Sequence, residues 1–101
     1  MSSHVIETVT FRVTDGVSEE AFLRAADEAT AFMRACPGFL RRRLSRQEDG
    51  VWVEHIEWAS VADANAAAAA IGQDERAQAF VRAIDGPSVR LARSELMISV
   101  G

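Results

Sequence analysis

The chain has 101 residues and a net charge of −4; 49% of its residues are hydrophobic and 26% are charged. These values fit one ordinary globular domain over residues 1–101 and count against a nucleic-acid-binding protein, which needs a basic face. No apolar run approaches the roughly 20 residues of a membrane span. Because Cys36 is the only cysteine and the N-terminus lacks a signal-peptide pattern, we expect a cytoplasmic protein without an intramolecular disulfide or a membrane partner.

Residues 5–13 alternate between apolar and polar side chains, which predicts a strand whose buried face includes Phe11. Ser18 is a good N-cap and is followed by two glutamates, which the helix dipole favours in a first turn. Proline has no N–H to donate and glycine adopts unusual backbone angles, so Pro37 and Gly38 should end this helix. Its apolar stripe follows helical spacing: Phe22, Ala25, Ala29, Phe32 and Cys36.

Two extended runs within residues 39–58 are separated by Asp49 and Gly50. Asp-Gly is typical of a two-residue type I′ turn, which needs positive φ at both central positions, so the sequence predicts a hairpin with that turn. In the resulting register, Arg43 lies beside Glu54 on one side of the ribbon. Neither side is plainly polar, which indicates a sheet with both faces at least half covered.

The remainder predicts two shorter helices and a last strand. Ser60 caps the first helix, Gly72 breaks it, the second helix starts near Asp74, and residues 89–100 form the strand. Five consecutive alanines in the first helix allow a close approach to its neighbours. The expected apolar positions are Val61, Ala64, Ala68 and Ile71 in the first helix and Ala77, Phe80, Val81 and Ile84 in the second.

The predicted element order is β-α-β-β-α-β, with the second helical segment split in two. This is the ferredoxin-like α+β arrangement, with a four-stranded antiparallel sheet. Right-handed crossovers place the helices on one face of the sheet. The other face should then expose a large apolar patch, which monomers avoid, so we expect a homodimer in which two sheets pack together.

Three short motifs resemble the dimeric α+β barrel superfamily, and more closely its antibiotic-biosynthesis-monooxygenase type. They are Pro37-Gly38-Phe39 after the first helix, the Asp49-Gly50 hairpin, and Glu57-Trp58-Ala59-Ser60 before the second helix. The resemblance implies a dimeric barrel with a ligand pocket between helices and sheet in each subunit. Members of that family include cofactor-free oxygenases of flat polycyclic quinols and haem-degrading enzymes.

The sequence departs from the active members of the family it resembles. The haem-degrading type has a first-strand asparagine and an iron-binding helix histidine, whereas here Asn65 is the only asparagine and His4 and His55 fall on predicted strands. The quinol oxygenases use a tyrosine, and the chain has none. Only the tryptophan, Trp58, carries over. We therefore expect no haem, flavin or metal cofactor, and no histidine, cysteine or carboxylate pair has a metal-binding spacing.

The residues that we assign to the ligand pocket are Trp58, Glu54, Phe11, Phe22, Phe80 and Arg43. Trp58 either stacks on a flat ligand or fills the core at the end of its strand. Glu54 is either a base in apolar surroundings or a surface or paired carboxylate beside Arg43. Glu7 is likewise either such a base or a carboxylate that solvent reaches near the start of the first strand. No residue is assigned a catalytic role.

Two functions remain open at this point. One is a cofactor-independent monooxygenase-like enzyme that acts on a small flat aromatic or quinonoid compound. The other is a non-catalytic ligand-binding or stress-responsive barrel protein.

Overall fold

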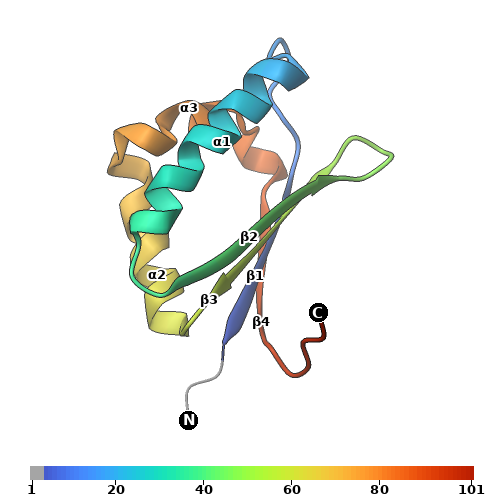
Figure 1. The fold of residues 1–101 in the computed structure, drawn as a ribbon. Helices are drawn as coiled ribbons and strands as arrows, with labels where there is room; N and C mark the ends of the chain where they lie inside the picture. The colour runs from blue at the N-terminus through green and yellow to red at the C-terminus, as the bar shows by residue number, and fades with distance from the viewer. Residues whose placement is uncertain (1–3) are drawn as a thin grey trace.

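The computed structural model describes residues 4–101 and shows a single antiparallel sheet in the order β2-β3-β1-β4, with the helices layered on one of its faces (Figure 1). The predicted ferredoxin-like α+β fold is confirmed. Two 3₁₀ turns, η1 (Ile71–Gln73) and η2 (Gly86–Ser88), flank the third helix. The strands and helices are β1 (Val5–Phe11), α1 (Glu19–Ala35), β2 (Phe39–Arg46), β3 (Trp52–Trp58), α2 (Val61–Ala70), α3 (Glu75–Ala83) and β4 (Arg90–Glu95).

Each helix begins at the cap that the sequence predicts. Ser18 Oγ accepts the N–H of Ala21 at 3.1 Å, and Ser60 Oγ accepts the N–H of Asp63 at 3.1 Å. Asp74 caps α3 by accepting a backbone N–H at 2.9 Å. These bonds satisfy donors that the first helical turn leaves free, so local chemistry alone locates the helix starts.

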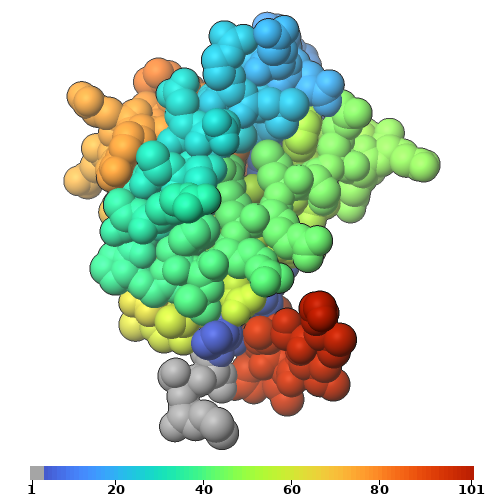
Figure 2. Space-filling model, viewed as in Figure 1, coloured from blue at the N-terminus to red at the C-terminus, as the bar shows by residue number. Residues whose placement is uncertain are grey.

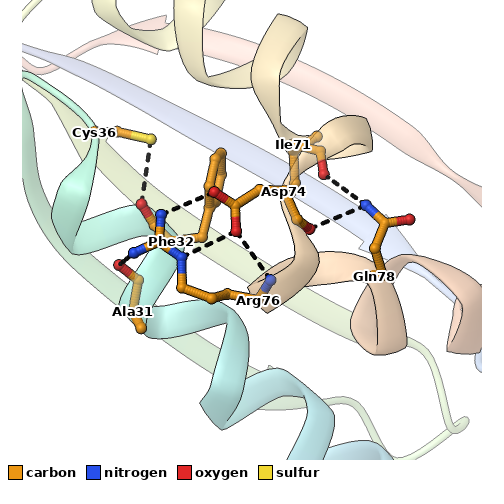
Figure 3. Close-up of polar contacts among 7 residues, drawn as sticks. All are labelled: Ala31, Phe32, Cys36, Ile71, Asp74, Arg76 and Gln78. Atoms are coloured by element: carbon orange, nitrogen blue, oxygen red, sulfur yellow. Dashed lines mark hydrogen bonds and ion pairs between the residues drawn. The ribbon is translucent and has the colours of Figure 1, made fainter.

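Figure 3 shows how Asp74 also anchors the corner between η1 and α3. Its two carboxylate oxygens accept hydrogen bonds from Nε and Nη2 of Arg76 at 2.9 and 2.8 Å. Arg76 Nη1 donates to the carbonyl oxygen of Ala31 on α1 at 3.5 Å. Gln78 Nε2 donates to the carbonyl oxygens of Ile71 and Asp74 at 3.3 and 3.0 Å. The hydrogen bonds from Arg76 lower the pKa of Asp74 to about 2. The corner therefore joins η1, α3 and α1.

The hairpin turn differs from the prediction. Gln47 N–H donates to the carbonyl of Val51 at 2.8 Å, and Gly50 N–H donates to the carbonyl of Gln47 at 3.0 Å, so the loop has three residues. Only Gly50 takes a positive φ, +87°, whereas type I′ would also require one at Asp49. Asp49 instead accepts the N–H of Val51 through its side chain at 3.0 Å. The extra loop residue shifts the strand register by one.

The core lies between the helices and the covered face of the sheet, and aromatic rings form its centre. Phe22 is fully buried and lies 5.9 Å from Phe11 and 4.7 Å from Trp52, measured between ring centroids. In α2 the buried residues are Ala64 and Ala67, while Val61 is 51% exposed. The predicted apolar stripes are therefore wrong at three exposed positions, Val61 and Ala68 in α2 and Val81 in α3. Instead, α2 turns Ala64 and Ala67 towards the core.

The last strand is shorter than predicted and ends at Glu95. Glu95 lies opposite Val5, the first residue of β1, so no strand remains for the following residues to pair with. After a single bond from Leu96 N–H to the carbonyl of His4, the chain leaves the sheet as a tail, residues 96–101, seen at the lower right of Figures 1 and 2. Three apolar residues of this tail are 78%, 83% and 91% exposed: Met97, Ile98 and Val100.

The uncovered face of the sheet is mostly polar, which corrects the expectation of a large apolar patch there. The register places alternate residues of every strand on this face, among them His55 and Glu57 on β3 and Arg41 and Arg43 on β2. His4 Nδ1 lies 2.9 Å from Glu57 Oε2. The exposed apolar side chains lie instead on the tail and at a few scattered positions.

Candidate functional site

A cavity of about 320 Å³ lies between the sheet and the segment formed by α2, η1 and α3. Its volume is within the range of small-molecule sites. Its walls are apolar side chains of both layers, and the only ionisable side chains among the described lining residues are Glu7 and Glu54. The roof includes Ala67 and Ala68 of α2, whose small side chains leave the space unfilled.

The structure brings most of the predicted pocket residues together. Trp58, Glu54, Phe11 and Phe80 all line the cavity. Phe22 does not, because it packs behind Phe11 within the aromatic core. Trp58 is 2% exposed, so it is both a core residue and a wall of the cavity.

Arg43 is not beside Glu54, and the three-residue hairpin loop is the reason. In the observed register Arg43 lies opposite His55, on the uncovered face, and Leu44 lies opposite Glu54. Arg42 takes the place expected for Arg43. The sequence signal was the run of three arginines, because consecutive residues of a strand face opposite sides of the sheet, so either the middle arginine or its two neighbours must lie on the covered side.

Arg42 and Glu54 form a buried ion pair, and of the two only Glu54 lines the cavity. Their side chains are 9% and 3% exposed, and Arg42 Nε donates to Glu54 Oε1 at 2.8 Å. Arg42 Nη1 donates to Thr30 Oγ1 at 2.8 Å and to the carbonyl of Ala26, both on α1, and its guanidinium carbon lies 5.2 Å from the ring centroid of Phe80. The pair therefore joins β2 and β3 to the helical layer.

Burial raises the pKa of Glu54 above its ordinary value of 4.5, and the nearby charge of Glu7 adds to this effect, while Arg42 opposes it. A carboxyl group in a cavity whose pKa is raised holds its proton more tightly than a carboxyl group in water does. Glu54 is therefore a buried carboxylate that is paired with Arg42 and also lines the cavity.

Three buried polar atoms have no hydrogen-bond partner within residues 4–101: Glu54 Oε2, Trp58 Nε1 and Arg42 Nη2. Buried polar groups are nearly always paired, so unpaired ones in a cavity point to a ligand or water. Glu54 and Trp58 line the cavity and offer one acceptor and one donor. They are four residues apart on β3, with Cα atoms about 13 Å apart.

A second ion pair lies beside the first. Arg93 Nε on β4 donates to Glu7 Oε2 on β1 at 3.1 Å, and Arg93 Nη1 donates to Asn65 Oδ1 on α2. The strand order β2-β3-β1-β4 therefore carries a charged row across the covered face of the sheet: Arg42, Glu54, Glu7 and Arg93. Glu7 is buried and paired rather than open to solvent at the start of its strand, and the sequence did not point to Arg93, because only the strand pairing brings the two residues together.

Neither a metal nor a membrane is indicated by the described part of the chain. In residues 4–101, no group of three or more histidine, cysteine, aspartate or glutamate side chains is placed to hold a metal ion. His4 and His55 lie before β1 and on β3, so no helix of the described chain carries a histidine for haem iron. None of the helices within this range has the length and apolar character needed to cross a membrane.

Comparison with known proteins yields matches among solved structures. No family model and no curated protein matches the chain. SnoaB from Streptomyces nogalater, a cofactor-independent oxygenase, superposes with a TM-score of 0.69 at 22% identity, over 99% of this chain and 97% of SnoaB. A Bordetella bronchiseptica protein assigned to the antibiotic biosynthesis monooxygenases superposes with a TM-score of 0.80 at 12% identity, over 95% of this chain and 99% of that protein. The fold is that of the antibiotic biosynthesis monooxygenase-like domains.

This agreement confirms the resemblance that the sequence motifs indicated. The same fold also serves a different chemistry. The hydroxynitrile lyase of Passiflora edulis superposes with a TM-score of 0.68 at 12% identity, over 100% of both chains. At such identities the likeness shows the fold alone, so the activity must be argued from the cavity.

Proposed function

We propose that the cavity binds a small, flat aromatic or quinonoid compound and that the chain acts on it as a cofactor-independent monooxygenase-like enzyme. The observation that carries this proposal is the unpaired acceptor of Glu54 and the unpaired donor of Trp58 in an otherwise apolar cavity. A compound with a hydroxyl group near one end and an oxygen acceptor near the other would satisfy both atoms. Quinols have this pattern, and their flat rings fit aromatic walls.

Glu54 is the proposed base. Its Oε2 accepts the hydroxyl proton of the ligand, and the resulting anion is the electron-rich species that molecular oxygen attacks. Arg42, held by Glu54 and Thr30, keeps a positive charge beside the reaction and favours the anion. SnoaB, a cofactor-independent oxygenase, has the same fold, which supports this class of reaction without defining the substrate.

The experiment is oxygen consumption with 1,4-dihydroxynaphthalene, together with binding of the redox-stable analogue 1-naphthol. We expect turnover above autoxidation in the wild-type chain and its loss in Glu54→Gln. Trp58→Phe keeps the ring but removes the N–H donor, so it should raise KM for 1,4-dihydroxynaphthalene, with less damage to the fold than Trp58→Ala. It should leave the binding of 1-naphthol, whose single hydroxyl goes to Glu54, unchanged. Arg43→Ala, on the uncovered face, is the matched control.

A non-catalytic ligand-binding protein is the alternative, favoured by the absence of tyrosine from the chain and of asparagine from β1. In that case the wild-type chain binds 1-naphthol and Glu54→Gln weakens this binding, while no variant and no wild-type sample consumes oxygen. If neither compound binds and Trp58→Ala only lowers stability, the ligand site itself is wrong.

We also propose that the chain works as a homodimer with the tail, residues 96–101, at the interface. Met97, Ile98 and Val100 are 78%, 83% and 91% exposed in one chain, and a second copy would remove these apolar side chains from water. Light scattering should give about twice the 11.0 kDa chain mass, and deletion of the tail should shift the sample towards monomer. A wild-type monomer at micromolar concentration contradicts this proposal.

A further inference from the structure

We propose that Glu7 is the proton exit of the cavity: it receives the proton that Glu54 takes from the ligand and passes it to solvent at the β4 edge of the sheet. The inference rests on the proposed function and assigns a role to a buried carboxylate that the proposed chemistry does not otherwise use.

A base that is closed off from water needs a second group for each turnover. The side chain of Glu54 is 3% exposed, so a proton held on Oε2 has little direct contact with solvent. Arg42 stays protonated at all relevant pH values and cannot take it. Glu7 is the one other ionisable side chain among the described residues that line the cavity.

Strand pairing places the two carboxylates close to each other. Glu7 lies opposite Ile56 and Glu54 lies opposite Val9, so they are diagonal neighbours on the same face of β1 and β3. Diagonal Cβ atoms are about 7–8 Å apart or somewhat less, which long side chains can span directly or through one water molecule. The charge of Glu7 contributes to the raised pKa of Glu54, which is consistent with this proximity.

Exposure rises along the charged row in the direction of the proposed transfer. The side chains of Glu54, Glu7 and Arg93 are 3%, 9% and 25% exposed. Arg93 holds Glu7 from β4, and its bond to Asn65 fixes it to α2. The charged and titratable groups around the two carboxylates are therefore Arg42 from β2 and Arg93 from β4; the lining residues from α1, α2, α3 and η2 are uncharged.

The oxidant is molecular oxygen, which accepts the electron pair of the ligand anion. One oxygen atom stays on the product, and the other leaves as water after taking up one proton from solvent in place of the proton released through Glu7. The ligand O–H bond breaks, its proton binds Glu54 Oε2, and the electron pair stays on the ligand oxygen. Glu54 then loses that proton as Glu7 gains one, and Glu7 releases it to water. Both carboxylates and both arginines return to their starting charges.

The first test does not depend on turnover. The carboxyl carbons of Glu7 and Glu54 are followed by NMR during a pH titration of the wild-type chain and of Glu7→Gln. We expect the titration midpoint of Glu54 to move to lower pH in Glu7→Gln, because a like charge is removed, and to stay unchanged in the control Glu57→Gln on the uncovered face. An unchanged midpoint in Glu7→Gln overturns the proposal.

The second test uses oxygen consumption with 1,4-dihydroxynaphthalene in dilute buffer. Glu7→Gln should lower kcat roughly 10- to 100-fold with KM unchanged, formate should restore the rate by carrying the proton, and Glu7→Asp should keep a larger part of it. A kcat that is unchanged, or that formate does not restore, overturns the relay. If the wild-type chain consumes no oxygen, the proposed function fails, while the NMR titration still decides whether the two carboxylates are coupled.

Discussion

The two faces of the sheet carry the same kinds of charged side chain, but the helices bury one face and leave the other uncovered. Arg42 and Arg43 are consecutive, yet Arg42 lies under the helices and Arg43 on the uncovered face. The covered ion pair, Arg42 with Glu54, is 2.8 Å long with side chains 9% and 3% exposed. The uncovered pair, His4 with Glu57, is 2.9 Å long with side chains 45% and 19% exposed.

The burial of an ion pair, and not the distance between its charged atoms, decides how much the pair contributes to stability. In water a charge that loses its partner is still solvated, so an exposed pair contributes little. A buried charge that loses its partner has nothing to replace it. The covered pair also leaves atoms without partners beside a cavity, which makes it available for chemistry in a way that the uncovered pair is not.

The largest expected difference between the faces is in stability. Arg42→Ala leaves the Glu54 carboxylate buried and uncompensated, and we expect the free energy of unfolding to fall by about 3–5 kcal/mol. Arg43→Ala should change it by no more than about 0.5 kcal/mol. Urea denaturation of the two variants measures both values, and equal losses would show that the register of β2 is wrong.

The pH dependence of stability sharpens the same comparison. Because the pKa of Glu54 is raised in the folded chain, the folded state binds this proton more tightly than the unfolded chain does. Glu54 therefore lowers stability as the pH rises from its ordinary pKa of 4.5 through the raised value. The free energy of unfolding of the wild-type chain minus that of Glu54→Gln should therefore fall as the pH rises through that window. Denaturation at several pH values measures this difference, and a difference that does not change with pH would contradict the raised pKa.

Asp74, a half-buried carboxylate outside the cavity, should show the opposite sign. Its pKa falls from 3.8 to about 2 through the hydrogen bonds from Arg76, so the stabilisation is present above 3.8 and is lost as the pH falls through about 2. Asp74→Asn should lose part of the acid-dependent change in melting temperature that the wild-type chain shows in this range. Identical acid profiles for the two proteins would rule out this role of the Arg76 bonds.

The smallest expected effect belongs to the uncovered pair. His4→Ala should lower the free energy of unfolding by about 0–1 kcal/mol, because both partners remain solvated when separated. The effect should also diminish in high salt. A loss comparable to that of Arg42→Ala would mean that this face is covered in solution, for instance by a second copy of the chain.

The parts of the fold that local chemistry determines could be predicted from the sequence. Ser18, Ser60 and Asp74 cap helices as expected, and Trp58 and Glu54 share the covered face of β3. The hairpin register could not be predicted, since Asp49-Gly50 fits both a two-residue loop and a three-residue loop with glycine last. This one-residue difference in loop length is why the predicted site contains Arg43, whereas the structure places Arg42 there.

The rest of the site depends on contacts between distant segments. Glu7 and Arg93 are 86 positions apart, and only the pairing of β1 with β4 brings them together. The length of β4 likewise depends on where β1 begins, which the apolar pattern of residues 89–100 does not report. The cavity is the space left between the helical layer and the sheet, and a pattern of residues along the chain does not give the size of that space.

The alanine-rich helix α2 has a consequence for how such a protein could change. Ala67 and Ala68 line the helical side of the cavity, whereas the two carboxylates, Glu7 and Glu54, lie on the strands opposite. A larger side chain at either alanine would reduce the room for a ligand without displacing a carboxylate. The residues that limit the size of a ligand and the proposed reactive residues therefore lie in separate parts of the chain. Substitutions in α2 could change which ligand fits without altering the proposed chemistry.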